Sequence, residues 1–372
     1  MRNNISEKTT AIKNPLSKTQ SRNYGIDLLK ITAMFFIVCV HLGGHGKAFP
    51  ETWFGALEHS IFATGVNCFA LTSGYLLIDK KYKLHRILVY WLQVVLYSSL
   101  IMLYFYIFYS GSVSKQEILF FLRPLYTDRY WYFSAYCIMY LFIPAYNTLL
   151  NSLSRKQTYT FIVTLVVIFS VLNLGVAEKY FALSGGFSVW WLSILYFIGA
   201  VIKKYMNISE CKVTVLLIVF LLSVILTTFF NIDKDKQNIR YFLKVGNFHY
   251  NSIVILLSSV TLFMLFTKIK INNPILQKFI TKISTLAFGV YLIHDNHHIR
   301  TKFVLNRFAW LGELSPVMNI LELLGIALVI FVTCLMIDYV RAFLFDVFKV
   351  NFLCEKLCGF FVKKRNLLFK NK

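Results

Sequence analysis

Tyr24-Gly-Ile-Asp-Leu-Leu-Lys-Ile-Thr-Ala-Met-Phe-Phe-Ile-Val-Cys-Val-His41 is an apolar stretch that contains three ionisable residues. On a helix that turns about 100° per residue, Lys30 lies about 20° from His41, and Asp27 lies about 40° from His41. One face of this helix therefore carries an acid, a base and an imidazole. Ionisable groups are energetically costly inside a membrane span, so their presence there indicates a functional site.

The rest of the chain is also apolar. Its 372 residues are 57% hydrophobic and 15% charged, with a mean hydropathy of +0.61. Soluble domains carry about 25% charged residues, so this deficit predicts an all-α polytopic membrane protein. Helices are expected because lipid offers no partners to unpaired backbone groups. About ten spans are predicted, at residues 25–44, 57–78, 87–109, 130–150, 158–176, 188–203, 213–230, 250–267, 283–299 and 319–341.

The basic residues predict how these spans are oriented. With both termini on the inner side, 26 Lys and Arg residues lie inside and 12 outside. The positive-inside rule therefore predicts a multi-pass protein of the cytoplasmic membrane with cytoplasmic termini. Residues 1–23 are expected to be a disordered basic segment, residues 24–345 the transmembrane domain, and residues 346–372 a basic cytoplasmic tail. Lys30 then lies toward the cytoplasm and His41 toward the outside.

Two classes of site are disfavoured. The net charge of +22 does not indicate a nucleic-acid partner, because the basic residues punctuate apolar runs and form no basic domain. The seven cysteines lack metal-ligand spacing and are expected to be small buried side chains. His294 and His298 are four residues apart and fit one helix face, but no zincin motif accompanies them. We therefore predict no metal.

His41 is the strongest candidate for chemistry, because a neutral imidazole can act as a general base. Antiparallel packing of the first two spans would bring Glu58 to a similar depth, where it could orient His41; a solvated loop end is the alternative. Lys83 and Arg86 are three residues apart and can face one phosphate, although a basic inner loop needs no function. Trp131 fits either an aromatic belt or a sugar-stacking site.

At these positions the chain resembles the acyltransferase-3 family, and within it the integral-membrane O-acetyltransferases of bacterial surface polysaccharides. Arg22-Asn-Tyr-Gly-Ile-Asp27-Leu-Leu-Lys30, followed by His41, is similar to the family's first span. Later motifs follow in the family's order: Phe69-Ala-Leu-Thr-Ser73-Gly-Tyr-Leu76, the pair Lys83 and Arg86, Trp131-Tyr-Phe, and Ser284-Thr-Leu-Ala-Phe-Gly-Val-Tyr-Leu-Ile-His294. Lys30 and Lys83 stand where the family has arginine, which keeps the charge but loses bidentate geometry.

The resemblance implies transfer of an acetyl or other acyl group from cytoplasmic acyl-CoA, expected to be acetyl-CoA, to a hydroxyl of a surface polysaccharide or lipid-linked glycan. It implies His41 as the base with Glu58 beside it, and Lys30, Lys83 and Arg86 as donor contacts. Whether His41 carries a covalent acyl group is left open. The substrate contacts expected are Asp27, Ser73, Tyr75, Trp131, Tyr291 and His294.

A transporter or flippase of lipid-linked glycans is the alternative function. That class of protein is built from internal repeats with interrupted helices and substrate charges near the midplane. We find no convincing repeat in this chain, and its ionisable residues gather toward the first two spans. A structural scaffold would offer no reason for Lys30 within the first span. The enzyme is therefore the favoured prediction.

Overall fold

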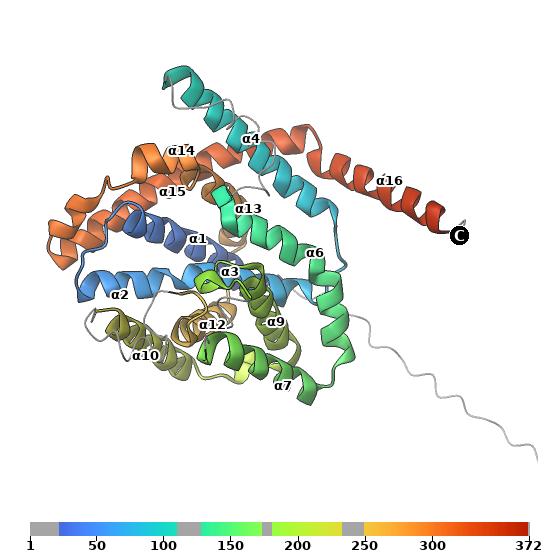
Figure 1. Cartoon of the computed structure of the whole chain (residues 1–372), viewed down its shortest axis with the longest axis horizontal. Helices are drawn as coiled ribbons and strands as arrows, with labels where there is room; N and C mark the ends of the chain where they lie inside the picture. Colours follow the sequence, from blue (N-terminus) through green and yellow to red (C-terminus); the bar gives the residue numbers. More distant parts are fainter. Residues whose placement is uncertain (1–21, 110–127, 173–180, 233–248, 371–372) are drawn as a thin grey trace, which may run out of the picture.

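The computed structural model describes residues 22–109, 128–172, 181–232 and 249–370. Every regular element in these ranges is helical, with no strand (Figure 1). The predicted disordered segment lies almost wholly outside the described residues, as do the last residues of the predicted span 158–176. The main helices are α1 Tyr24–Gly44, α2 Trp53–Phe62, α3 Thr64–Leu77, α4 His85–Phe108, α6 Trp131–Ser152, α7 Arg155–Val166, α9 Val189–Tyr205, α10 Val213–Ile232, α12 Ile253–Thr267, α13 Pro274–His294, α15 Pro316–Val347 and α16 Val350–Lys370.

Six segments of the described residues are long and apolar enough to cross a membrane. They are α1, the α2–α3 pair at Trp53–Leu77, α4, α6, α10 and α15, and each lies on a predicted span. The other four predicted spans also lie on helices, namely α7, α9, α12 and α13. Of these, α7, α9 and α12 are shorter, and α13 begins with a lysine-containing half. The all-α polytopic membrane fold is confirmed, whereas the number of ten spans stays a prediction.

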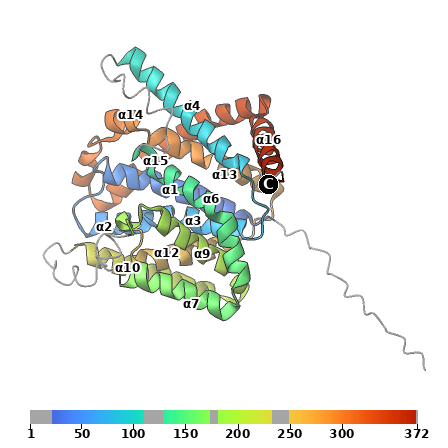
Figure 2. The same cartoon turned by 45° about the vertical axis from the view of Figure 1, so that its right-hand side comes forward.

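Helix α1 lies in the middle of the bundle, where it contacts α3, α12, α13 and α15 (Figures 1 and 2). Its first turn is fixed by Asn23, whose side chain accepts the Ile26 N–H and donates to the Thr267 carbonyl. Gly25 allows the close approach of α12, because a Cβ there would lie 2.0 Å from the Phe266 carbonyl oxygen. The helix that carries the ionisable face is therefore held rigidly at its first turn.

Helices α1 and α13 run side by side in the same direction. Ser284, in the middle of α13, donates to Asp27 in the first turn of α1 at 3.1 Å, and at the last turns of both helices His41 lies against His294. These two contacts, 14 residues apart on α1 and ten apart on α13, fix both the register and the direction of the pair. This parallel pairing is what brings the two imidazoles together.

A buried ion pair ties α15 to the neighbouring helices. Arg341 donates to both Asp338 oxygens at 2.9 and 2.6 Å, and the Tyr97 hydroxyl of α4 donates to the same carboxylate at 2.6 Å. A Cβ on Gly289 of α13 would lie 2.0 Å from the Asp338 carboxyl carbon, so glycine makes room for the acid. Buried charges require such pairing, because leaving one of them alone is strongly destabilising.

Replacing Asp338 with alanine should destabilise the fold. The change leaves the Arg341 guanidinium buried without its carboxylate, a loss of about 3–5 kcal/mol. Thermal unfolding of the detergent-solubilised protein, followed by size-exclusion chromatography after heating, would measure the loss. Asp346→Ala, on the exposed side of the same helix, is the matched control and should behave like wild type. Equal thermal stability of the two variants would contradict a structural role for the pair.

Candidate active site

His41 and His294 form a hydrogen-bonded imidazole pair at the C-terminal ends of α1 and α13. His41 Nδ1 lies 2.9 Å from His294 Nε2. His294 Nδ1 in turn lies 2.6 Å from the carbonyl oxygen of Val290, one turn earlier in α13. His294 is buried, whereas the His41 side chain is 17% exposed. The first-span histidine therefore has an ordered partner and an accessible edge.

These hydrogen bonds determine which ring nitrogens carry protons. The Val290 carbonyl can only accept, so His294 Nδ1 must carry the proton of that hydrogen bond. In a neutral ring, His294 Nε2 is then an acceptor, and His41 Nδ1 must donate to it. His41 Nε2 is left with its lone pair free. This is the tautomer in which a histidine acts as a general base.

Asp295 adds a carboxylate directly beside the pair. Its Oδ1 lies 3.7 Å from His41 Nδ1 and 3.0 Å from Nη1 of Arg300, and the residue is 3% exposed. The acid is therefore placed to stabilise a positive charge that develops on His41, while Arg300 keeps the resting carboxylate paired. Neither Asp295 nor Arg300 is among the site residues predicted from the sequence. The feature that could have identified them is the run of polar residues from Asp295 to Arg300, which follows the apolar part of the span.

His45 closes the site from the turn after α1. Its backbone N–H donates to the His41 carbonyl at 2.9 Å, and the two rings lie 5.3 Å apart. Burial and the nearby Arg300 guanidinium lower the pKa of His45 below its usual range, so this imidazole is neutral near pH 7. The carbonyl of His45 accepts the Asn306 N–H at 2.9 Å, which fastens the segment after α13 onto this turn.

The same side chains also offer a donor set for a metal. Ligand atoms of His41, His45 and Asp295 all lie within 4.8 Å of one another, and imidazole with carboxylate suits several transition metals. The Arg300 guanidinium, however, already occupies Asp295, and a cation would compete with it for the carboxylate. The hydrogen-bonded arrangement needs no ion to order His41, so the absence of a metal stays our prediction.

Chelation should therefore leave catalysis unchanged. If His294 and Asp295 order His41 directly, EDTA treatment followed by removal of the chelator should not alter the rate of acyl transfer beyond assay error. Rates in membranes before and after chelation would test this. A loss that added zinc or another divalent ion restores would show that the three ligand atoms hold a metal.

Glu58 does not reach the imidazole pair. It is 3% exposed, and its two carboxylate oxygens have no hydrogen-bond partner among the described residues. It faces Cys39 of α1. Cys39 and His41 are two residues apart, which places them about 200° apart on the helix. The predicted contact between Glu58 and His41 is therefore not formed, and the residues beside His41 are His294 and Asp295.

The inner end of the ionisable face is an ion cluster centred on Asp27. Lys30 Nζ lies 3.1 Å and Arg22 Nε 2.5 Å from its carboxylate, which also accepts from Ser284. The Lys30 side chain stays 24% exposed. Asp27, expected to contact substrate, is thus fully engaged by protein groups, and Lys30 is positioned by it.

Lys83 and Arg86 lie on one short segment at the start of α4, and both are exposed. The Tyr140 hydroxyl of α6 donates to the Lys83 carbonyl at 3.1 Å, and the Arg86 guanidinium lies beside the same hydroxyl. The segment is therefore anchored to α6 by its backbone. Both cationic side chains are exposed, and their binding to a phosphate stays a prediction.

Two predicted substrate residues lie between this segment and the imidazoles. Ser73 of α3 is within 3.3 Å of the Tyr136 hydroxyl. The Tyr291 ring of α13 packs against Tyr130 and Tyr132, with centroid distances of 5.8 and 6.5 Å. Both belong to an aromatic interior shared by α3, α6 and α13.

Of the other two predicted substrate residues, Trp131 borders this interior through Tyr132, with ring centroids 5.4 Å apart, and Tyr75 packs elsewhere. Trp131 packs on Phe187 and Tyr250, with centroids 4.6 and 6.3 Å away. Tyr75 lies against Phe263, and the Lys203 ammonium sits 4.9 Å from its ring centroid. The structure therefore does not bring Tyr75 to the imidazole pair.

A sequence model described as an acyltransferase domain matches residues 23–339. The chain belongs to the acyltransferase-3 family. No curated protein and no solved structure matches it. The match includes the imidazole pair and the Lys83–Arg86 segment, and α16 lies beyond its end. The family resemblance of the motifs is thus confirmed, and the protein is a multi-pass membrane acyltransferase.

Proposed function

We propose that this acyltransferase moves an acetyl group from acetyl-CoA to a hydroxyl of a cell-surface polysaccharide or of its lipid-linked precursor, at the cytoplasmic membrane. The observation that carries the proposal is the imidazole pair. His41 has a free Nε2 lone pair because His294 occupies its Nδ1, and Asp295 lies 3.7 Å from that same Nδ1. This is the arrangement that a base needs when it must become positively charged during the reaction.

The chemistry follows from these atoms. His41 Nε2 takes the proton of the acceptor hydroxyl as its oxygen attacks the thioester carbonyl carbon. The new carbon–oxygen bond forms, the carbon–sulfur bond breaks, and the thiolate takes the proton back from His41 to leave as the free thiol. Asp295 and the His294 ring stabilise the transient imidazolium on the opposite nitrogen. The proton returns at the end of each cycle, so His41 is regenerated as the base.

The donor would bind from the side of Lys83 and Arg86. Two exposed cations at the start of one helix suit the phosphates of a nucleotide. Lysine contributes a point charge where arginine would give a bidentate contact. The predicted orientation places this end in the cytoplasm, where acyl-CoA is made. Lys30 lies farther inside and would add a partly exposed charge along the route.

The acceptor would approach from the opposite end, beside Trp131. The Tyr130 hydroxyl accepts from Asn296 at 2.8 Å and donates to the Leu292 carbonyl at 2.9 Å, which ties the start of α6 to the end of α13. The aromatic group formed by Trp131, Phe187 and Tyr250 therefore lies at the start of α6, which is tied to the end of α13 where His294 lies. Aromatic faces with a polar edge suit sugar rings, which present apolar faces and hydroxyl edges.

Replacing His41 with alanine should abolish transfer. Loss of the general base is expected to lower the rate at least 10²-fold, measured as labelled acetyl moved from acetyl-CoA to surface glycan in membranes. NMR of O-acetyl groups on glycans from cells with and without the protein would identify the acceptor. A fully active His41→Ala enzyme would overturn the assignment. A wild-type protein that binds no acetyl-CoA would instead favour the flippase.

Replacing His294 with phenylalanine should lower kcat with little change in KM. The ring shape is kept, but His41 Nδ1 loses its acceptor, and its tautomer is no longer fixed. A fall in kcat of about 10²-fold is expected, with the KM for acetyl-CoA within a factor of about two because His294 lies away from the phosphate-binding segment. His298→Phe is the matched control, since that histidine stacks on Phe105. Equal kcat values for the two variants would remove His294 from the mechanism.

A further inference from the structure

Five tyrosines form a continuous row through the interior, which we call the tyrosine row. In order they are Tyr82, Tyr140, Tyr136, Tyr132 and Tyr291, with successive ring centroids 5.2, 6.1, 6.2 and 6.5 Å apart. Three of them are spaced four residues apart on α6, so they share one face of that helix. The segment before α4 supplies the first ring, and α13 supplies the last.

The tyrosine row joins the two ends of the proposed site. At one end, the Tyr140 hydroxyl donates to the Lys83 carbonyl and lies beside Arg86. At the other end, Tyr291 is three residues before His294 on α13, and therefore on the same side of that helix. Along α6 the row from Tyr132 to Tyr140 covers about 12 Å. The tyrosine row therefore extends from the Lys83–Arg86 segment to the helix that carries His294.

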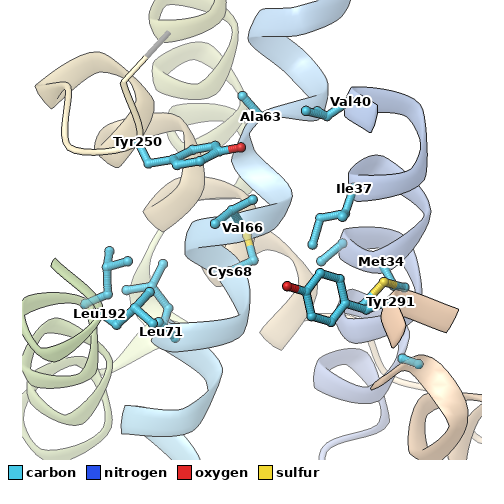
Figure 3. Packing of buried hydrophobic residues seen from close by; sticks show 14 of the residues in the cluster. Met34, Ile37, Val40, Ala63, Val66, Cys68, Leu71, Leu192, Tyr250 and Tyr291 are labelled. Atoms are coloured by element: carbon cyan, nitrogen blue, oxygen red, sulfur yellow. The ribbon is translucent and has the colours of Figure 1, made fainter. Parts of the chain in front are cut away.

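Some hydroxyl groups of the tyrosine row have no hydrogen-bond partner among the described residues. The hydroxyl oxygens of Tyr82 and Tyr132 are buried without a hydrogen-bond partner among the described residues. The Tyr291 hydroxyl is also buried and lies beside the Tyr132 backbone, without a well-formed hydrogen bond to it. Tyr291 is 5% exposed, and Figure 3 shows its ring pointing from α13 toward Cys68 of α3. An unsatisfied buried hydroxyl costs about 1–3 kcal/mol, so such groups are rare in native interiors.

Simple packing does not explain these hydroxyls. Phenylalanine would fill the same volume without the unsatisfied oxygen, and it does so at adjacent positions, where Phe133 and Phe288 pack with centroids 6.1 Å apart. The hydroxyl of Tyr136 also lies within reach of Ser73, so a polar line follows the rings. Such a row fits a ligand in which apolar segments alternate with hydrogen-bonding groups, because the rings would contact the former and the hydroxyls the latter.

We propose that the tyrosine row binds the pantetheine arm of the acyl-CoA donor, with the hydroxyls of Tyr132 and Tyr291 as partners for its amide groups. The arm is a chain of methylene segments separated by amides, so its apolar parts would lie on the rings and its amides would meet the hydroxyls. This inference rests on the proposed function. It adds the residues that would carry the thioester from the phosphate-binding segment to His41.

The test uses Tyr132→Phe and Tyr291→Phe in the full chain. Each change removes one oxygen and keeps the ring, and each should raise the KM for acetyl-CoA about fivefold to tenfold, as expected for one hydrogen bond, with kcat within a factor of about two. Tyr106→Phe, on an exposed tyrosine of α4, is the matched control and should match wild type. Tyr82→Phe offers a second variant at the edge of the row if an interior change lowers the yield.

Truncated donors separate this inference from the proposed function. The KM increase should persist with S-acetylpantetheine, which keeps the amides, and disappear with S-ethyl thioacetate, which has none. If wild type transfers acetyl and the variants match its KM with every donor, the inference is overturned while the function stands. An equal defect with S-ethyl thioacetate also overturns it, because that result indicates a structural effect. A wild type without transfer from acetyl-CoA overturns both.

Discussion

In a bundle surrounded by lipid, a polar side chain can be satisfied only by protein groups or by a ligand, because the lipid core offers no partners. The arrangement of α1 and α13 follows from this constraint. Asp27, in the first turn of α1, accepts a hydrogen bond from Ser284 in the middle of α13, and His41 contacts His294 at the last turns of both helices. Both contacts form together only when the helices run parallel in one register. The Asp338–Arg341 pair holds the opposite side of α13 through the space that Gly289 leaves.

The same constraint separates structural from functional polar groups. The pair Asp338 and Arg341 is fully matched by protein atoms, as expected for a structural tie between helices. The hydroxyls of Tyr132 and Tyr291 are buried without a well-formed hydrogen bond in the described part of the chain. Between these extremes, His41 has one ring nitrogen occupied and the other free for substrate. Catalysis is therefore expected at a polar group that has one atom hydrogen-bonded to the protein and another atom free to meet a substrate.

Periodicity and charge were sufficient to predict the helices and the ionisable face of α1, because both are properties of one segment. The family resemblance gave His294 as a substrate contact and not as the partner of His41, since that contact spans 253 positions of the chain. The prediction that Glu58 contacts His41 rested only on the similar depth of the two residues in the membrane. Depth in the membrane does not specify which way a side chain faces, and Glu58 lies near Cys39, on the side of α1 away from His41. Asp295 was missed because a polar residue that ends a span resembles any interfacial residue.

Lysine in place of arginine at position 30 has a physical explanation in the same cluster. Asp27 already receives Arg22 at 2.5 Å and Lys30 at 3.1 Å, so the carboxylate is shared between two cations. An ammonium needs a single contact with the carboxylate and keeps its other donors free. Asp27 therefore positions Lys30 and leaves some of its N–H donors free for another partner. Its partly exposed charge lies on the same α1 face as His41, which is where an anionic or strongly polar part of a donor would pass.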